Sequence, residues 1–173
     1  MAFQITNKRF ILRALQSPDA FSLAKHANNQ KIEANLTDVF PFPYTPSDAN
    51  NFILAKKNET PIKTFAIVID GKAVGVISIS PRVGIYRITA EIGYWVGESF
   101  WGQGIMNEAI KEILNYTFVT FPEVLKIVAF VYDFNIGSAK ALEKAGFELE
   151  SISRKAAIKN ENVCDILNYV CFK

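Results

Sequence analysis

The pattern of hydrophobic and polar residues changes near residue 63, from one that indicates helices to one that indicates strands. In the first part, a Ser-Pro pair predicts a helix from Pro18 to about Leu36, and a Thr-Pro pair predicts another from Pro46 to about Asn58. The mixed apolar and cationic run 9–15 is expected to be an opening strand. Because the prolines of residues 40–45 lack an N–H donor, this aromatic stretch is expected to be a loop between the two helices.

After residue 63 the pattern becomes that of strands. Residues 64–69 are β-branched and aromatic, and Asp70-Gly71 is a strong hairpin signal. The run Val74–Ser80 continues as a second strand, and Ala90–Val96 predicts a third. The middle of the chain is therefore expected to form strands of one sheet.

Helix and strand then alternate. Apolar residues recur at helical spacing after Gly104, and the nearly continuous apolar run 124–132 is typical of a strand covered on both faces. Asn135 or Ser138 can cap a further helix that ends at Gly146.

The last part of the chain predicts a pair of strands, 147–154 and 163–172, around a turn near Lys159-Asn160. The expected order is therefore a strand, two helices, three strands, a helix, a strand, a helix and a final pair of strands. That order is typical of a mixed α/β sheet, and no internal repeat or linker interrupts it.

Composition narrows the class of protein. The 173 residues carry 19 Lys+Arg against 17 Asp+Glu, and 50% of them are hydrophobic. This length and composition suit a single globular domain over 1–173 whose core needs no disulfide or metal. A net charge of +2 without a basic stripe gives no reason to expect nucleic-acid binding. Two cysteines and one histidine make a poor metal site, so no metal is expected.

The location is predicted from the apolar runs. They are much shorter than the roughly 20 residues that span a bilayer, so no membrane binding is expected. Residues 1–10 are polar and charged where a signal peptide has an apolar stretch. The expected location is therefore the cytoplasm.

The segment 94–106 contains the most informative candidate site. Gly102 and Gly104 leave the backbone uncovered where a helix begins, so successive N–H groups and the positive end of the helix dipole face outward together. This arrangement suits a phosphate or pyrophosphate group. The segment lacks the Lys-Ser/Thr of a P-loop and the full G-x-G-x-x-G of a dinucleotide fold. Glycines that serve only a tight turn and close helix packing are the alternative.

The segment 132–147 is a second candidate. Asn135 and Ser138 stand at the start of a helix that follows an apolar strand. Helix capping is the alternative to a binding role for both side chains.

Five motifs, taken in their order along nearly the whole chain, resemble the GNAT family of N-acetyltransferases. Within it, they are most similar to the ribosomal-protein alanine acetyltransferase-like (RimJ/RimL-type) subgroup. The motifs are Arg9-Phe-Ile-Leu-Arg-Ala-Leu15, Phe42-Pro-Tyr-Thr45, Glu91-Ile-Gly-Tyr-Trp-Val96, Trp101-Gly-Gln-Gly104 with Glu108-Ala109, and Asn135-x-x-Ser138 leading to Glu143-Lys-Ala-Gly-Phe147.

The resemblance implies the family's fold and its acetyl-CoA loop. The fold is a mixed, mostly antiparallel sheet of about six to seven strands flanked by four helices, splayed between the strands 91–96 and 124–132. The family's loop reads Gln/Arg-x-x-Gly-x-Gly/Ala, and Trp101, Gly104 and Met106 stand at its three defined positions. Trp101 is usual for the subgroup, whereas Met106 is larger than the family's residue. The residues implied to contact acetyl-CoA are Tyr94, Trp95, Val96, Trp101, Gly102, Gln103, Gly104, Ile105, Met106 and Asn135.

The implied activity is direct transfer of an acetyl group from acetyl-CoA to a primary amine. Attack requires a neutral amine, so a base has to remove a proton, and a donor has to protonate the departing thiolate. Glu91, acting through water, is the expected base, because a carboxylate within an apolar strand has a burial cost that needs a reason. A charge at the solvated end of the strand is the alternative, and Asp165 is the competing base. Ser138 matches the family's serine and is the expected acid, since the stretch 141–144 contains no tyrosine.

The acceptor is less defined. The loop 40–45 and the final hairpin are expected to line its site, with Phe42 and Tyr44 in contact with the amine, unless these aromatics only close the edge of the core. The acceptor is a protein N-terminus or a small amine, and the acyl group can differ from acetyl. A non-catalytic acyl-CoA-binding sensor is the alternative function, and a monomer or a homodimer is expected. His26 is expected on a solvated helix face and is given no role.

Overall fold

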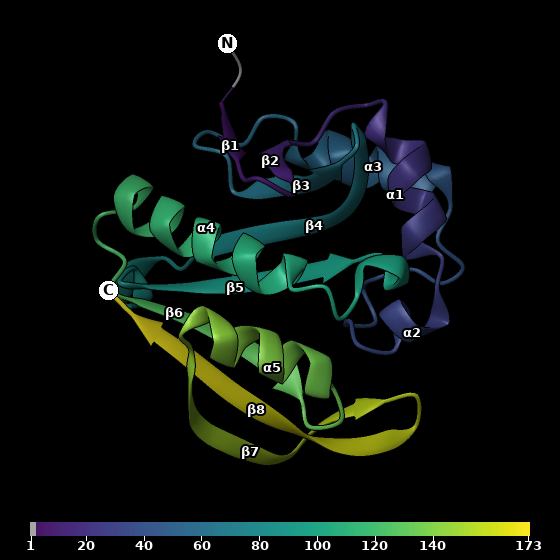
Figure 1. Cartoon of the computed structure of the whole chain (residues 1–173). Helices are drawn as coiled ribbons and strands as arrows, with labels where there is room; N and C mark the ends of the chain where they lie inside the picture. Colours follow the sequence, from purple (N-terminus) through teal and green to yellow (C-terminus); the bar gives the residue numbers. More distant parts are fainter. Residues whose placement is uncertain (1–2) are drawn as a thin grey trace. The chain divides into compact units, whose positions relative to one another are not determined.

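The computed structural model describes residues 3–173, so the first two residues of the expected 1–173 domain lie outside the described residues. Its strands form one open, mostly antiparallel sheet in the order β1-β2-β3-β4-β5-β6-β8-β7, in which the pair β5–β6 is parallel (Figure 1). The predicted mixed α/β class is confirmed. Over residues 3–173 the structure has eight strands and five α-helices, one strand and one helix more than the upper expectation.

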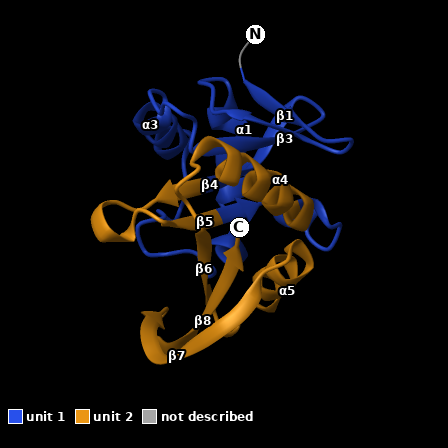
Figure 2. Cartoon of the chain, turned by 90° about the vertical axis from the view of Figure 1, so that its left-hand side faces the viewer, with its two compact units in different colours: residues 1–78, 94–105 blue, residues 79–93, 106–173 orange. Residues whose placement is uncertain are grey.

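The chain forms two compact units, which Figure 2 shows in different colours. Unit 1 comprises Met1–Ser78 and Tyr94–Ile105, and unit 2 comprises Ile79–Gly93 and Met106–Lys173. The strands β4 (Lys72–Pro81) and β5 (Thr89–Val96) each continue from one unit into the other. The expectation of a single domain stays a prediction.

Unit 1 contains four antiparallel strands at the start of the sheet order. In the register, Ile5 lies opposite Leu12, Ile11 opposite Val68, and Phe65 opposite Ile77. The predicted strands at 9–15, 64–69 and 74–80 are all present, whereas a strand before residue 9 was not expected, because three residues are too few to show a period. The strands are β1 (Gln4–Thr6), β2 (Ile11–Ala14), β3 (Thr64–Ile69) and the first part of β4.

The helices of unit 1 are α1 (Asp19–Ala27), α2 (Gln30–Glu33) and α3 (Pro46–Lys56). The expectation of one helix from Pro18 to about Leu36 is wrong, because the backbone is extended at Asn29 and the side chain of this residue accepts a hydrogen bond from the N–H of Lys31 at 2.8 Å. Asparagine competes with the helix for backbone hydrogen bonds, so it ends α1 and begins α2. The α3 start is confirmed, with a capping box between Thr45 and Asp48.

The core of unit 1 lies between α1, α3 and one face of the strands. Leu23 of α1 and Ile53 of α3 are 1% and 2% exposed, and they share a cluster with Ala66 and Val68 of β3. Residues 64–68 of β3 are all buried, which explains their continuous apolar run.

Unit 2 contains the strands at the other end of the sheet. β6 (Lys126–Tyr132) lies between β5 and β8 (Asn162–Phe172), and β8 pairs with β7 (Glu148–Lys159). The parallel register of β5 with β6 covers Thr89–Glu91 and Lys126–Val128, which is the region from which the resemblance implies a splay. The turn predicted near Lys159-Asn160 is confirmed as a two-residue loop with positive φ at Asn160 (48°) and Glu161 (65°).

The two helices after the glycine segment are α4 (Ile105–Thr120) and α5 (Ile136–Ala145), as expected. On α4, the fully buried side chains of Ala109, Ile110 and Ile113 follow the predicted helical spacing. Helix α5 ends at Gly146, whose φ of 99° is the left-handed conformation of a C′ glycine.

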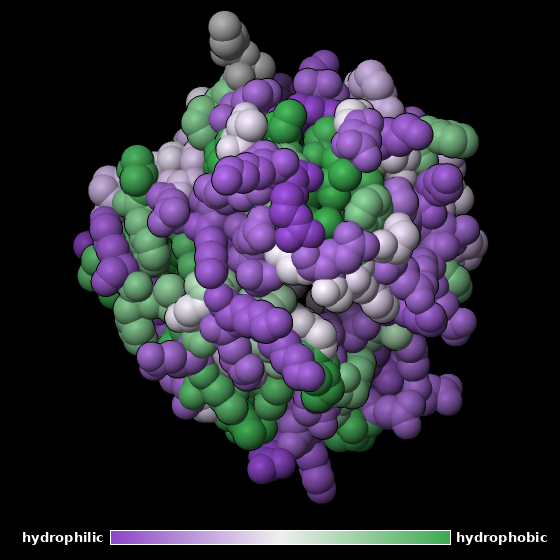
Figure 3. All heavy atoms as spheres, viewed as in Figure 1, coloured by the Kyte–Doolittle hydropathy of each residue, from purple (hydrophilic) through white to green (hydrophobic). Residues whose placement is uncertain are grey.

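Hydrophilic side chains cover most of the face drawn in Figure 3, with hydrophobic ones between them in small groups. Within residues 3–173, no helix is long and apolar enough to cross a membrane, and no cluster of three or more His, Cys, Asp or Glu side chains is arranged to hold a metal ion.

Candidate functional site

The glycine loop before α4 has the backbone that its sequence requires. Gly102 and Gly104 have φ angles of 72° and 78°, a region that residues with a Cβ atom rarely adopt. Within residues 3–173, the backbone N–H groups of these two glycines have no hydrogen-bond acceptor. They stand immediately before a helix of 16 residues, whose first N–H groups also lack partners inside the helix. The donor set fits an anionic ligand such as a pyrophosphate group.

Three side chains hold this loop. The indole Nε1–H of Trp101 donates to the carbonyl oxygen of Val96 at 2.8 Å, and the amide of Gln103 donates to the carbonyl of Ser99 at 2.8 Å. The guanidinium of Arg9 donates to the carbonyl of Gln103 at 2.6 Å. Arg9 lies in one of the five motifs, but the sequence indicates no role for it in the loop, because a contact over 94 positions leaves no local signal.

The turn that precedes the loop is packed against α1. The N–H of Gly97 donates to the carbonyl of Val74 at 2.8 Å, and a Cβ atom on Gly97 would lie 2.5 Å from Nδ1 of His26. The His26 ring meets the Phe100 ring edge to face, with centroids 5.6 Å apart. The expectation that His26 lies on a solvated helix face is therefore wrong. Burial, with a smaller effect from Lys25, lowers the pKa of His26.

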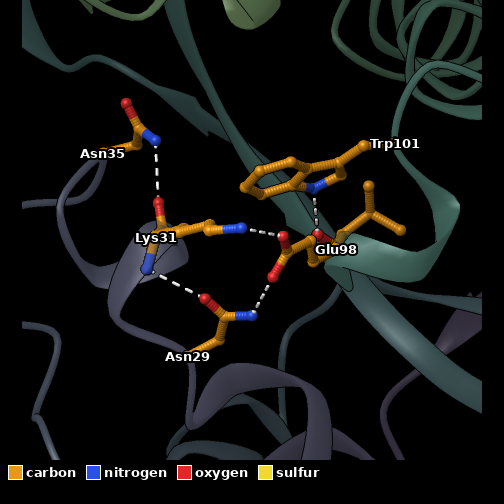
Figure 4. A network of polar contacts seen from close by, with 6 residues as sticks. Asn29, Lys31, Asn35, Glu98 and Trp101 are labelled. Carbon is orange, nitrogen blue, oxygen red and sulfur yellow. Dashed lines mark hydrogen bonds and ion pairs between the residues drawn. The ribbon is translucent and has the colours of Figure 1, made fainter.

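A network of polar side chains joins α2 to the same turn (Figure 4). Glu98 accepts a hydrogen bond from Nδ2 of Asn29 at 2.7 Å and forms an ion pair with Nζ of Lys31. These two donors lower the pKa of Glu98, Lys31 having the larger effect. The amide of Asn35 donates to the carbonyl of Lys31 at 2.8 Å. None of these side chains is among the site residues expected from the sequence.

The strand end before the turn is half-buried. Trp95 packs against the core of unit 1 and meets the ring of Phe40 edge to face at 6.1 Å, while Val96 is 6% exposed. Tyr94 is half-buried. On α4, Ile105 is buried and Met106 is half-buried. The acetyl-CoA contacts expected of these residues stay predictions.

The two aromatic residues expected at the acceptor site differ in exposure. Phe42 is 50% exposed, whereas Tyr44 is 6% exposed and its ring stacks on Phe40 with centroids 4.8 Å apart. Burial raises the pKa of Tyr44 to about 12, with a smaller contribution from Asp48. Tyr44 thus closes the core of unit 1, as the alternative held. A contact of either residue with an acceptor stays a prediction.

In unit 2, the side chain of Glu91 is more exposed than the apolar sequence of its strand suggests. Its side chain is 46% exposed, and its carboxylate lies 3.4 Å from the guanidinium of Arg82. The expected burial is wrong because alternate residues of a strand face opposite sides, so that Ala90 and Ile92 are buried while Glu91 is not. A catalytic role for Glu91 stays a prediction.

A cavity of about 390 Å³ lies beside the Glu91–Arg82 pair in unit 2. Its lining includes Arg82, Thr89, Phe130 and Asn168. The Arg82 guanidinium lies 5.9 Å from the centroid of the Phe130 ring, and the Asn168 amide donates to two serine hydroxyls of β7. The lining is therefore both polar and aromatic.

Only one of the two candidate capping residues, Asn135 and Ser138, caps the start of α5. Oδ1 of Asn135 accepts a hydrogen bond from the backbone N–H of Ser138 at 3.1 Å, so Asn135 is the N-cap and the Ser138 hydroxyl is not. The structure also brings a tyrosine to this helix from β8: the Tyr169 hydroxyl donates to Glu143 at 2.8 Å. Burial first, and then Glu143, raises the pKa of Tyr169 to about 12.

Asp165, the competing base, holds an irregular part of the final hairpin. Its carboxylate accepts hydrogen bonds from the N–H of Lys155 and the guanidinium of Arg154, both at 2.8 Å. The register of β7 with β8 shifts between Ser153 and Ala157, and Lys155 has a φ of 49°. These donors, the Lys155 N–H first, lower the pKa of Asp165. The carboxylate therefore has a structural function in this bulge.

Within each unit, the structure brings together only part of the predicted set. Trp101 contacts Val96 in unit 1, and Asn135 contacts Ser138 in unit 2. Three residues that were not expected at the site contact predicted ones: Arg9, Glu98 and Arg82. Asn29 and Lys31 are connected to the predicted set through Glu98.

Comparison with known proteins places these features in a family. Residues 9–148 match the model described as an acetyltransferase (GNAT) domain. A protein of Bacillus subtilis (strain 168) named "Probable N-acetyltransferase YjcK" is 37% identical over 86 residues, or 50% of this chain and 47% of that protein. The ribosomal-protein-serine acetyltransferase of Escherichia coli (strain K12) is 32% identical over 107 residues, or 62% of this chain and 59% of that protein. The chain thus spans about half the length of these relatives.

A solved structure is similar over nearly the whole chain. The crystal structure of the microcin C7 self immunity acetyltransferase MccE, in complex with acetyl-CoA and AMP, has a TM-score of 0.82 and 26% sequence identity. The match covers 96% of this chain and 94% of that one.

Proposed function

The chain belongs to the GNAT family of acetyltransferases, and we propose that it transfers an acetyl group from acetyl-CoA to a primary amine. The observation that carries the proposal is the loop in which Gly102 and Gly104 hold left-handed conformations and offer unpartnered N–H groups before α4. The family match over residues 9–148 includes this loop. A single acetyltransferase domain over the whole chain is part of the proposal.

The backbone of the loop supplies the donors for the cofactor's phosphates. In this proposal the amides of residues 102–106 bind the pyrophosphate, and the backbone of Tyr94–Val96 pairs with the pantetheine arm. The carbonyl of Val96 already accepts one hydrogen bond, from Trp101, which fixes its direction. Asn135 keeps the start of α5 in place through its cap. Backbone N–H groups near the thioester stabilise negative charge that develops on its oxygen.

The chemistry requires two proton transfers. The amine nitrogen attacks the carbonyl carbon of the thioester, the bond between carbon and sulfur breaks, and the amine loses a proton while the departing sulfur gains one. Glu91 accepts the first proton, through water. Its side chain is 46% exposed, so water can reach the carboxylate. Ser138 supplies the second proton, since its hydroxyl is not used in the cap.

The acceptor is proposed to be the N-terminus of a protein or peptide. The name of the Escherichia coli relative, a ribosomal-protein-serine acetyltransferase, supports this class, and a small amine is the other possibility. Phe42, which is 50% exposed in the loop before α3, is proposed to contact the acceptor. A ribosomal acceptor also agrees with the expected cytoplasmic location.

A thiol-release assay with acetyl-CoA tests the function. Peptides that begin with serine, alanine or methionine are compared with polyamines as acceptors, after calorimetry has measured acetyl-CoA binding. Turnover with any of these amines supports the proposal, and the preferred acceptor identifies the class. Binding without turnover on any acceptor supports the alternative, a non-catalytic acyl-CoA sensor. The absence of acetyl-CoA binding would contradict both functions.

A further inference from the structure

Polar contacts lead from the α2 segment to Glu98 (Figure 4), and a backbone hydrogen bond continues from Glu98 to Trp101 of the glycine loop, all within unit 1. These contacts begin at Asn35, whose amide donates to the carbonyl of Lys31, and continue from Lys31 and Asn29 to the Glu98 carboxylate. The backbone N–H of Trp101 donates to the carbonyl of Glu98 at 3.0 Å, and the indole of Trp101 reaches Val96. The carboxylate is the one member that joins the α2 segment to the turn.

Neither of the two elements joined by Glu98 is stable by itself. Helix α2 has four residues, and the turn that contains Glu98 is a 3₁₀ helix of three residues, Glu98–Phe100. Helices of this length do not persist without outside contacts, because their nucleation is unfavourable. Both ends of the Asn29 amide are used, since Oδ1 accepts the N–H of Lys31 while Nδ2 donates to Glu98. Both oxygens of Glu98 are used as well.

We propose that Glu98 is a positioning residue for acetyl-CoA, which couples the order of the α2 segment, residues 29–35, to the geometry of the glycine loop. This inference rests on the proposed function. A ligand that binds the ordered loop stabilises the turn, and through Glu98 it stabilises α2. The coupling is reciprocal, so loss of the Glu98 contacts weakens the binding of acetyl-CoA.

The size of the effect follows from the exposure of the pair. The side chains of Lys31 and Glu98 are 67% and 39% exposed, so water and salt screen their attraction. Glu98→Gln and Lys31→Met are therefore each expected to raise the Kd for acetyl-CoA by about 1.5-fold to fivefold. The double variant is expected to bind acetyl-CoA with the same affinity as the weaker-binding single variant, because both changes remove the same contact.

Hydrogen exchange supplies a readout that a simple loss of stability would not produce. In the wild-type protein, acetyl-CoA is expected to slow amide exchange in residues 29–35. In Glu98→Gln this protection disappears even at a concentration that saturates the loop. Lys31→Arg keeps the positive charge that Lys31→Met removes, so it is expected to retain both the wild-type affinity for acetyl-CoA and the protection of residues 29–35. Lys57→Met, which removes an exposed lysine from the end of α3, is the matched control and leaves both unchanged.

The outcomes separate this inference from the proposed function. If the wild-type protein does not bind acetyl-CoA, the proposed function fails. If the wild-type protein binds and Glu98→Gln keeps both the wild-type Kd and the protection of residues 29–35, only the positioning role is wrong. Additive effects in the double variant would also overturn it, since they would show that Lys31 and Glu98 act independently.

Discussion

The glycine loop of unit 1 and the helix start of unit 2 are held in different ways. The loop depends on residues far away in the sequence: Arg9 donates to Gln103 over 94 positions, and Asn29 and Lys31 contact the preceding turn over more than 60. The start of α5 depends on one local contact, from Asn135 to the N–H of Ser138 three residues later. We therefore expect the loop to respond to changes at these distant residues, whereas the helix start is expected to respond mainly to changes in its own residues.

The largest effect is expected at the loop itself. Gly104→Val places a β-branched side chain at a φ of 78°, where it shifts the backbone and covers the N–H groups that would bind phosphate. Calorimetry is expected to show a Kd for acetyl-CoA raised more than about a hundredfold. The control is Gly71→Val in the hairpin turn, which has a φ of 74° and no neighbour within 4 Å.

Both glycine variants carry the same kind of backbone strain, about 1–2 kcal/mol by the usual penalty for a left-handed residue. Thermal unfolding is expected to show a similar loss of stability in both, while only Gly104→Val loses acetyl-CoA. Equal affinities in the two variants would show that the loop glycines serve only the turn and the helix packing. In that case the distant contacts of the loop would support structure rather than binding.

This contrast also explains which features were predictable from the sequence. The strands 64–69 and 90–96 and the helix that ends at Gly146 were predictable, because period, hairpin and cap signals are local. The break of the first helix at Asn29 has a local cause, the capping of α2 by its side chain, which the Ser-Pro signal and the apolar pattern did not reveal. The burial of Tyr44 depends on tertiary contacts. For the site, the glycine positions were visible in the motif, whereas Arg9 and Glu98 were not identified. Their partners lie too far along the chain for spacing to reveal them.

The second-largest effect is expected in unit 2, at the proposed base Glu91. Glu91→Gln is expected to lower kcat by about 10²–10⁴, the usual contribution of a general base, and to leave the Kd for acetyl-CoA unchanged. Steady-state kinetics with a saturating acceptor, together with calorimetry, measure the two quantities. Glu148→Gln, at an exposed carboxylate of β7, is the control and should retain full activity. A wild-type kcat in Glu91→Gln would remove this residue as the base.

A smaller effect separates chemistry from capping at the start of α5. Because Asn135 supplies the cap, Ser138→Ala is expected to leave the capping of α5 intact while it lowers kcat. Asn135→Ala is expected to reduce the free energy of unfolding by about 1 kcal/mol, the usual loss for an N-cap. Denaturant unfolding and thiol release measure both variants. An unchanged kcat in Ser138→Ala would mean that another group protonates the sulfur.

The smallest effect is expected at Asp165, and its pH dependence tests whether this carboxylate is structural. Its folded-state pKa is lowered, chiefly by the N–H of Lys155, so its stabilising contribution is fully present above the unfolded pKa of about 4. This contribution is lost as the pH falls through the folded-state pKa. Asp165→Asn is therefore expected to lower the unfolding midpoint slightly at pH 7, and the difference from the wild-type protein should shrink in acid. The rate should stay unchanged at pH 7. A large fall in kcat with an unchanged unfolding midpoint would make Asp165 the base in place of Glu91, and the bulge at Lys155 would then belong to the catalytic site.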